Sequence, residues 1–145
     1  MGNPFVYYRI ESLQDLKRDG SCAVRGLDWH ADLAAIRRFY ARFGQTINPD
    51  ELDSYVGTPA AIMHDGEIVS FAIPLSFRVG ETEIGGVATV PDQRNKGLCK
   101  ALISEMAFRI LEQGKAAALT TEKTNIPMQK AAEAIGMKRL QERKD

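Results

Sequence analysis

The sequence predicts an α+β fold in which a mixed, mostly antiparallel sheet is flanked by helices. The main observation is a change of apolar spacing along the chain: helical between residues 29 and 57, alternating from 60 to 90, and helical again after 94. The length of 145 residues is that of one domain, and no repeat, low-complexity tract or linker divides it. We therefore expect one domain over residues 1–145, with residues 1–20 as an N-terminal extension.

The first elements are expected to be short. Residues 5–10 are aromatic and β-branched, which favours a strand, and residues 11–17 favour a short helix. Residues 21–25 have the composition of a brief strand. Apolar residues then recur every three or four positions over residues 29–43, which predicts a helix with Asp28 as its N-cap.

The middle of the chain predicts a short helix followed by a hairpin. Pro49 opens the short helix, which is expected to end near residue 57 with Asn48 as its cap. Residues 60–64 and 67–76 alternate as strands around an Asp-Gly pair at 65–66, a favoured two-residue hairpin turn. Pro74 lacks an N–H donor, so it predicts an edge or a bulge late in the second strand.

The last third of the chain predicts a β-α-β-α unit. Residues 81–90 form a strand stopped by Pro91, and a long helix follows Arg94 and ends at Gly114. A buried strand is expected over residues 116–121. A last helix follows over 126–135, with Gly136 after it, and then one strand over 137–142. This leaves a shortened C-terminal strand region.

Charge and composition exclude several classes of function. Nineteen Lys and Arg balance nineteen Asp and Glu, which argues against a broad grip on nucleic acid or anionic lipid. No apolar run approaches the roughly 18 residues that span a membrane. Cys22 and Cys99 are far apart, and with two histidines they form no metal-ligand spacing. We therefore expect a cytoplasmic protein with no metal site.

The most informative stretch is a strand that runs through a glycine turn directly into a long helix. The first turn of a helix has unpaired N–H groups and a positive dipole end, which attract phosphate oxygens. Gly97 lets an anion approach the backbone, and Arg94, Lys96 and Lys100 add positive charge. The stretch has neither the G-x-x-x-x-G-K-S/T phosphate loop nor G-x-G-x-x-G. A solvated, charged helix start remains the alternative interpretation.

The same stretch resembles the acetyl-CoA motif of the GNAT superfamily of N-acetyltransferases. That motif has a Gln or Arg, then two residues, a Gly, one residue, and a Gly or Ala; residues 94–99 read Arg-Asn-Lys-Gly-Leu-Cys. Residues 125–137 resemble the second motif of the family, in which an Asn begins a helix that a Gly closes. The resemblance covers about residues 81–137.

The resemblance implies a site for acetyl-CoA as the acyl donor. The backbone amides of residues 94–99 would bind the pyrophosphate, and residues 87–89 would pair with the pantetheine arm and polarise the thioester carbonyl. Asn125 would lie near the thiol end. The expected cofactor-binding residues are Val87, Ala88, Thr89, Arg94, Asn95, Lys96, Gly97, Leu98, Cys99, Lys100 and Asn125.

The chain departs from the family pattern at three positions. Cys99 replaces a Gly or Ala, and it is either a small buried residue or, less in keeping with direct transfer, a nucleophile. Met137 replaces the closing aromatic. Ala132 stands where many members have a Tyr that protonates the departing thiolate, so Tyr55, Tyr40 or water would serve instead.

A general base is also required, because an alkylamine is nearly all protonated at neutral pH. Glu83 shares strand parity with Val87 and Thr89, so all three are expected on one face, and its position resembles the base glutamate of some family members. A solvent-facing carboxylate at a strand end is the alternative. Glu81 and Glu122 are the other candidates.

The resemblance leaves the sheet one strand short after the second motif. Either residues 5–10 fill the missing place or a second subunit does, which would make a homodimer. The expected function is an N-acetyltransferase that moves acetyl directly from acetyl-CoA to a primary amine of a small molecule or peptide. A catalytically silent acyl-CoA-binding sensor or subunit is the alternative, and an unrelated phosphate- or nucleotide-binding domain is a third interpretation.

Overall fold

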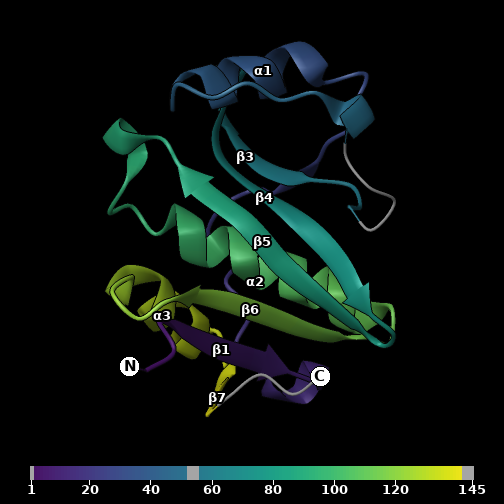
Figure 1. Ribbon diagram of the computed structural model, residues 1–145, viewed down its shortest axis with the longest axis vertical. Helices are drawn as coiled ribbons and strands as arrows, with labels where there is room; N and C mark the ends of the chain where they lie inside the picture. Colours follow the sequence, from purple (N-terminus) through teal and green to yellow (C-terminus); the bar gives the residue numbers. More distant parts are fainter. Residues whose placement is uncertain (1, 52–55, 142–145) are drawn as a thin grey trace.

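The computed structural model describes residues 2–51 and 56–141, which form one mixed sheet with helices on both faces (Figure 1). Its strand order is β2-β3-β4-β5-β6-β1-β7. The strands are β1 (Phe5–Ile10), β2 (Arg25–Gly26), β3 (Ala60–His64), β4 (Glu67–Arg78), β5 (Glu81–Thr89), β6 (Ala116–Glu122) and β7 (Lys138–Leu140). The helices are α1 (Leu33–Ala41), α2 (Leu98–Glu112) and α3 (Ile126–Ala134), with 3-10 turns η1 (Leu13–Asp15), η2 (Pro49–Glu51) and η3 (Pro91–Gln93).

The sheet is mostly antiparallel, as the sequence predicted. Among the described strands, β5 and β6 form the parallel pair, and the other neighbours are antiparallel. The Asp65-Gly66 turn joins β3 to β4, and both residues have positive φ, 51° and 77°. Such a turn matches the right-handed twist of the two strands, which is why this hairpin could be predicted.

The two faces of the sheet carry different helices. On one face, the buried ring of Phe71 on β4 packs against Phe39 and Tyr40 of α1, with ring centroids 5.5 and 5.6 Å apart. On the opposite face, Thr82 of β5 and Met106 of α2 line the same small cavity. Helix α2 runs behind β4 and β5 in the view of Figure 1. The sheet therefore separates α1 from α2.

Two helices begin later than the sequence predicted. Helix α1 starts at Leu33 and not at residue 29, because Asp28 caps a preceding turn: its Oδ1 accepts from the backbone N–H groups of His30 (2.9 Å) and Ala31 (2.7 Å). Helix α2 starts at Leu98 and not just after Arg94. Asn95 has a φ of 64°, a left-handed conformation that no helical residue adopts.

Other boundaries also differ. The expected helix over 11–17 is only η1, because its turn closes within three residues. The strand expected over 21–25 was wrong: only Arg25 and Gly26 pair, since β3 offers partners only at Ala60 and Ala61. The last strand has three residues instead of six among those described.

The helix expected over 49–57 is the short turn η2, and residues 52–55 lie outside the described residues. Pro74 lies in β4 beyond the last pairing of that strand with β3, at Ala72, so its missing N–H breaks no bond of that ladder.

The N-terminal strand takes the place that the sequence left open. Strand β1 pairs with β6 on one side and with β7 on the other, both antiparallel. Tyr8 on β1 is 1% exposed, and its hydroxyl donates to Glu133 Oε2 of α3 at 2.6 Å. Residues 5–10 of the same chain therefore fill this place in the sheet.

Candidate functional site

The turn before α2 is shaped to accept an anion. Gly97 is the N-cap of α2 in the left-handed conformation, with φ 78°, and no side chain caps this end of the helix. The first intrahelical bond recorded here runs from Ala101 N to Gly97 O, at 3.1 Å. A Cβ at Gly97 would meet no atom within 4 Å, so the space above the turn is open. These features fit a phosphate group bound by the first amides of the helix.

The predicted cations surround this turn, and each has a partner within the chain. Arg94 Nε donates to the Thr89 carbonyl at 3.0 Å, and Lys96 Nζ to Gln93 Oε1 at 3.2 Å. Lys100 Nζ lies 3.6 Å from Asp19 Oδ2. All three cationic residues are exposed, as are Asn95 and Gly97, while Leu98 and Cys99 are half-buried.

Strands β5 and β6 separate beside this turn. Their pairing is recorded only from Glu81 to Glu83 with Ala116 to Ala118. The later residues of β5 keep their pairing with β4, through Ser70↔Thr89 and Phe71↔Ala88. The diverging ends of β5 and β6 lie on the same side of the molecule as the starts of α2 and α3 (Figure 1). The edge of β5 at residues 87–89 could therefore accept an extended ligand as an added strand.

The expected common face of Glu83, Val87 and Thr89 was wrong. Between the pairs Ile73↔Gly85 and Phe71↔Ala88, β5 advances by three residues while β4 advances by two. Strand β5 therefore contains a bulge. Gly86 within it has a φ of 58°. An extra residue reverses the alternation of side chains, so Thr89 faces away from Glu83. Its hydroxyl lies 2.9 Å from that of Ser70.

Asn125 begins α3, as predicted. Its Oδ1 accepts from the backbone N–H of Met128 at 3.3 Å, so the side-chain carbonyl is engaged as the N-cap. Cys99 Sγ lies 3.7 Å from Met128 Sδ, which brings the starts of α2 and α3 together. Asn125 is exposed beside this contact.

Cys99 is poorly suited to act as a nucleophile. Burial raises the pKa of its thiol to about 11. The reactive form of a cysteine is the thiolate, which is scarce at neutral pH under this condition. The geometry therefore favours the interpretation of Cys99 as a small, partly buried residue.

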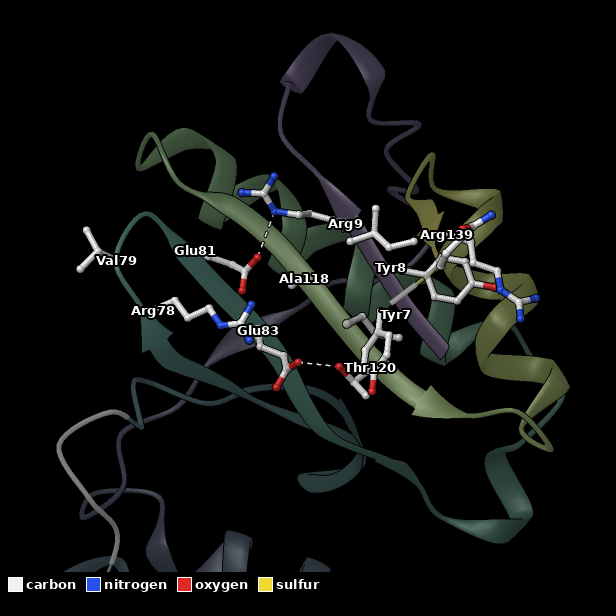
Figure 2. Close-up of a pocket in the computed structure, with 13 residues that line it drawn as sticks. Tyr7, Tyr8, Arg9, Arg78, Val79, Glu81, Glu83, Ala118, Thr120 and Arg139 are labelled. Atoms are coloured by element: carbon white, nitrogen blue, oxygen red, sulfur yellow. Dashed lines mark hydrogen bonds and ion pairs between the residues drawn. The ribbon is translucent and has the colours of Figure 1, made fainter. Parts of the chain in front are cut away.

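Glu83 lies on the face of the sheet that carries α1, and it is only 9% exposed. Its Oε1 accepts from Thr120 Oγ1 of β6 at 2.7 Å, as Figure 2 shows. Glu81, two residues earlier, accepts from Arg9 Nε of β1 at 3.0 Å. Glu122, the third candidate, is exposed at the end of β6.

A cavity of about 790 Å³ opens beside Glu83. Its walls come from the β4–β5 hairpin, β6, β1 and β7, and its lining includes both Glu81 and Glu83. This volume lies in the range of small-molecule sites. Sequence reasoning missed the other polar lining residues, which are Tyr7, Tyr8, Arg9, Arg78, Thr120, Arg139 and Gln141. The aromatic and β-branched composition of residues 5–10 predicted a strand but not which strand it would join.

The two tyrosines predicted as replacements for the missing proton donor differ in what the structure says of them. Ala132 is fully buried. Tyr40 packs edge-on against Phe71, and burial raises the pKa of its hydroxyl. Tyr55 lies outside the described residues. Of the alternatives that the sequence left open, the structure disfavours Tyr40, and Tyr55 and water stay open.

The described residues contain neither a helix suited to cross a membrane nor a group of metal ligands. None of their helices is both long and apolar enough to cross a membrane. No three of their His, Cys, Asp or Glu side chains are grouped as metal ligands.

Comparison with known proteins identifies relatives of this fold. Residues 28–137 match the family model described as the acetyltransferase (GNAT) family. A GNAT-family protein from Novosphingobium aromaticivorans DSM 12444 superposes with a TM-score of 0.74 at 17% identity, over 94% of this chain and 60% of that one. No curated protein matches the sequence.

Two further solved structures are similar. A GCN5-related N-acetyltransferase from Kribbella flavida has a TM-score of 0.64 at 19% identity, over 92% of this chain and 53% of that one. The ribosomal-protein-S18-alanine N-acetyltransferase from Escherichia coli has a TM-score of 0.63 at 19% identity, over 79% of this chain and 76% of that one. The chain thus spans 60% and 53% of the first two structures.

Proposed function

Because the chain belongs to the GNAT acetyltransferase family, we propose that it moves an acetyl group from acetyl-CoA to a primary amine of a small molecule or a peptide. The single observation that carries the proposal is a buried carboxylate, Glu83, in a cavity where β5 and β6 begin to separate. The E. coli protein named above is called a ribosomal-protein-S18-alanine N-acetyltransferase, and that name supports an amine as the acceptor class.

The donor site is proposed at the turn before α2 and along the edge of β5. The amides of residues 94–99 would bind the pyrophosphate, with Arg94, Lys96 and Lys100 adding positive charge. The edge of β5 at Val87–Thr89 would bind the pantetheine arm through backbone groups. Acetyl-CoA supplies an activated thioester whose carbonyl carbon accepts the amine.

Glu83 is proposed as the general base. An acceptor amine arrives as an ammonium ion, and Glu83 takes one proton so that the neutral nitrogen can attack. A nitrogen–carbon bond forms and the carbon–sulfur bond breaks. The nitrogen gives its second proton to water, and water in turn passes a proton to the sulfur of the departing thiolate. A thiol with a pKa of about 9 leaves readily, so a tyrosine donor at position 132 is not required.

The test begins with donor binding. The melting temperature is measured with acetyl-CoA, CoA and ATP in parallel. A ligand at ~100 times its dissociation constant stabilises by about 2.7 kcal/mol, a rise of several degrees. We expect that rise with acetyl-CoA and CoA and none with ATP. No rise with either CoA species would overturn the proposed donor site.

Turnover is then measured as thiol release with a panel of primary amines. Glu83→Gln is expected to keep the melting shift and to lower kcat/KM by about 100-fold or more at neutral pH. Glu67→Gln is the matched control, because Glu67 is exposed and pairs with Arg38 at 2.9 Å. Binding of acetyl-CoA without turnover of any amine would instead favour the silent acyl-CoA-binding module.

A further inference from the structure

The cavity beside Glu83 contains more cationic than anionic side chains. Its described charged lining consists of three arginines and two glutamates, which are Arg9, Arg78, Arg139, Glu81 and Glu83. A site for a polyamine would be expected to show an excess of carboxylates, because each additional ammonium group needs a counter-charge. The lining of this cavity has the opposite balance.

Two of the three arginines are directed to other groups. Arg9 pairs with Glu81 at 3.0 Å and also contacts Glu11, so two carboxylates neutralise it. Arg139 is in register with Tyr8, and Figure 2 shows its side chain on the Tyr8 side, turned away from Glu83. Neither guanidinium is directed at the space next to Glu83.

Arg78 is the cation beside Glu83. It is in register with Glu81 across the β4–β5 hairpin, so both side chains start from neighbouring positions. Figure 2 shows the guanidinium of Arg78 pointing into the space between Glu81 and Glu83. A guanidinium has five N–H donors in a planar fork and keeps donors for a ligand while bonded elsewhere. The cavity therefore presents a carboxylate and a guanidinium side by side.

We propose that the acceptor is a zwitterion: a primary amine that carries a carboxylate or phosphate close to its nitrogen. This inference rests on the proposed function, because Glu83 receives the amine while Arg78 binds the anionic group. A guanidinium matches the two oxygens of a carboxylate or phosphate and discriminates against a second ammonium group. The class includes free amino acids and phosphorylated amino alcohols.

The test uses acceptor pairs that differ only by the anionic group. L-phenylalanine is compared with 2-phenylethylamine for a carboxylate, and O-phosphoethanolamine with ethanolamine for a phosphate. We expect the anionic member of at least one pair to have a kcat/KM higher by about tenfold or more. The pair that responds identifies the anion. The inference is overturned if neither pair shows a preference for its anionic member. It is also overturned if the anionic members are not acetylated.

Variants then assign the preference to Arg78. Arg78→Met is expected to lower kcat/KM for the anionic acceptor about tenfold, mainly by raising its KM. For the uncharged acceptor, kcat/KM should stay within about threefold of the wild-type value. Arg78→Lys restores part of the loss, because it keeps the charge without the fork. Arg38→Met, at an exposed pair on α1, is the control. An equal loss for both acceptors would mean that Arg78 only holds the glutamates, which contradicts the inference.

Product binding separates this inference from the proposed function, because it needs no turnover. N-acetyl-L-phenylalanine and N-acetyl-2-phenylethylamine, with the corresponding phosphate pair, are titrated into the wild type and Arg78→Met by calorimetry. If the wild type binds an anionic product more tightly than its uncharged counterpart, and Arg78→Met abolishes that difference, the inference is supported even if Glu83 is not the base. Equal binding within both pairs overturns it even if the chain acetylates amines.

Discussion

Thr120 and Glu83 lie on the two parallel strands that separate at the candidate site, and a hydrogen bond joins them there. Thr120 Oγ1 donates to Glu83 Oε1 at 2.7 Å, and Glu83 is 9% exposed. The bond lies just beyond the last recorded backbone pairing, Glu83↔Ala118. It therefore fixes the direction of one carboxylate oxygen at the point where the strands diverge.

Thr120 is expected to act as a positioning residue for Glu83. Thr120→Val removes the hydroxyl with little change in shape, and loss of a hydrogen bond to a charged group corresponds to about a tenfold fall in kcat. The KM for acetyl-CoA should stay the same, and Thr120→Ser should restore kcat. Steady-state kinetics of the variants checks this.

The control for that variant is Thr121→Val. Thr121 is in register with the buried Val6, on the opposite side of β6 from Thr120, so this change should leave kcat unaltered. A fall in kcat for Thr121→Val as large as that for Thr120→Val would show that β6 tolerates no substitution here. The role of the hydroxyl would then be rejected.

Gly97 and Gly114 provide a matched pair for the donor site. Both have a φ of 78°, and at both a Cβ would meet nothing within 4 Å. Alanine at either position therefore carries a similar backbone cost, about 1 kcal/mol. Of the two, Gly97 is the N-cap of α2, at the proposed donor site.

Gly97→Ala is therefore expected to lower the affinity for acetyl-CoA about tenfold, because its Cβ occupies the approach to those amides. Gly114→Ala should melt at a similarly reduced temperature but bind acetyl-CoA as the wild type does. Calorimetric titration measures both affinities. Equal affinities for the two variants would reject an anion site at this turn.

The turn before α2 and the N-cap of α3 could be predicted because they depend on local chemistry. Gly97 needs a left-handed conformation that few other residues adopt, and Asn125 satisfies an N–H at the start of α3 with its own side chain. The same holds for the Asp65-Gly66 hairpin turn. In each case the residues that decide the structure are within a few positions of one another.

The parity of β5 could not be predicted, because the bulge at Gly86 arises from the register on β4. Nothing near Gly86 in the sequence shows that three residues of β5 will match two of β4. The bulge turns Thr89 toward Ser70 and away from Glu83. A rule of strict alternation therefore failed at the site where the strand matters most.

The walls of the cavity could not be predicted for a related reason. Arg9 and Glu81 form an ion pair across 72 positions of sequence. The composition of residues 5–10 predicted the strand correctly, but it carries no information on the neighbours of that strand in the sheet. Tyr7 and Arg9 reach the cavity because β1 lies between β6 and β7.

Tyr8 is expected to make stability depend on alkaline pH. Burial, followed by the hydrogen bond to Glu133, raises the pKa of its hydroxyl from 10.0 to about 12. The folded state therefore favours the neutral phenol more than the unfolded state does. This contribution to stability is complete below pH 10 and is lost as the pH rises to about 12.

Tyr8→Phe should therefore melt a few degrees lower than the wild type at pH 8, and the difference should shrink between pH 10 and 12. Tyr7→Phe is the control at pH 8, because the hydroxyl of Tyr7 bonds only to exposed Asn3 among the recorded contacts, at 2.7 Å. Thermal melting across this pH range is the measurement. A constant difference between Tyr8→Phe and the wild type would contradict the assignment.

Cys99→Ala is expected to leave catalysis intact. With a thiol pKa of about 11, fewer than about one thiol in a thousand is ionised at neutral pH, which is too few for a nucleophile that every turnover must use. Alanine also restores the small residue that the family motif has at this position, so the affinity for acetyl-CoA should be retained.

We expect the kcat of Cys99→Ala to lie within about threefold of the wild-type value. The mass of the wild-type protein should show no added acetyl group after incubation with acetyl-CoA alone. An acetylated Cys99 that forms and decays at the rate of turnover would overturn direct transfer, because the acetyl group would then pass through the enzyme before it reaches the amine.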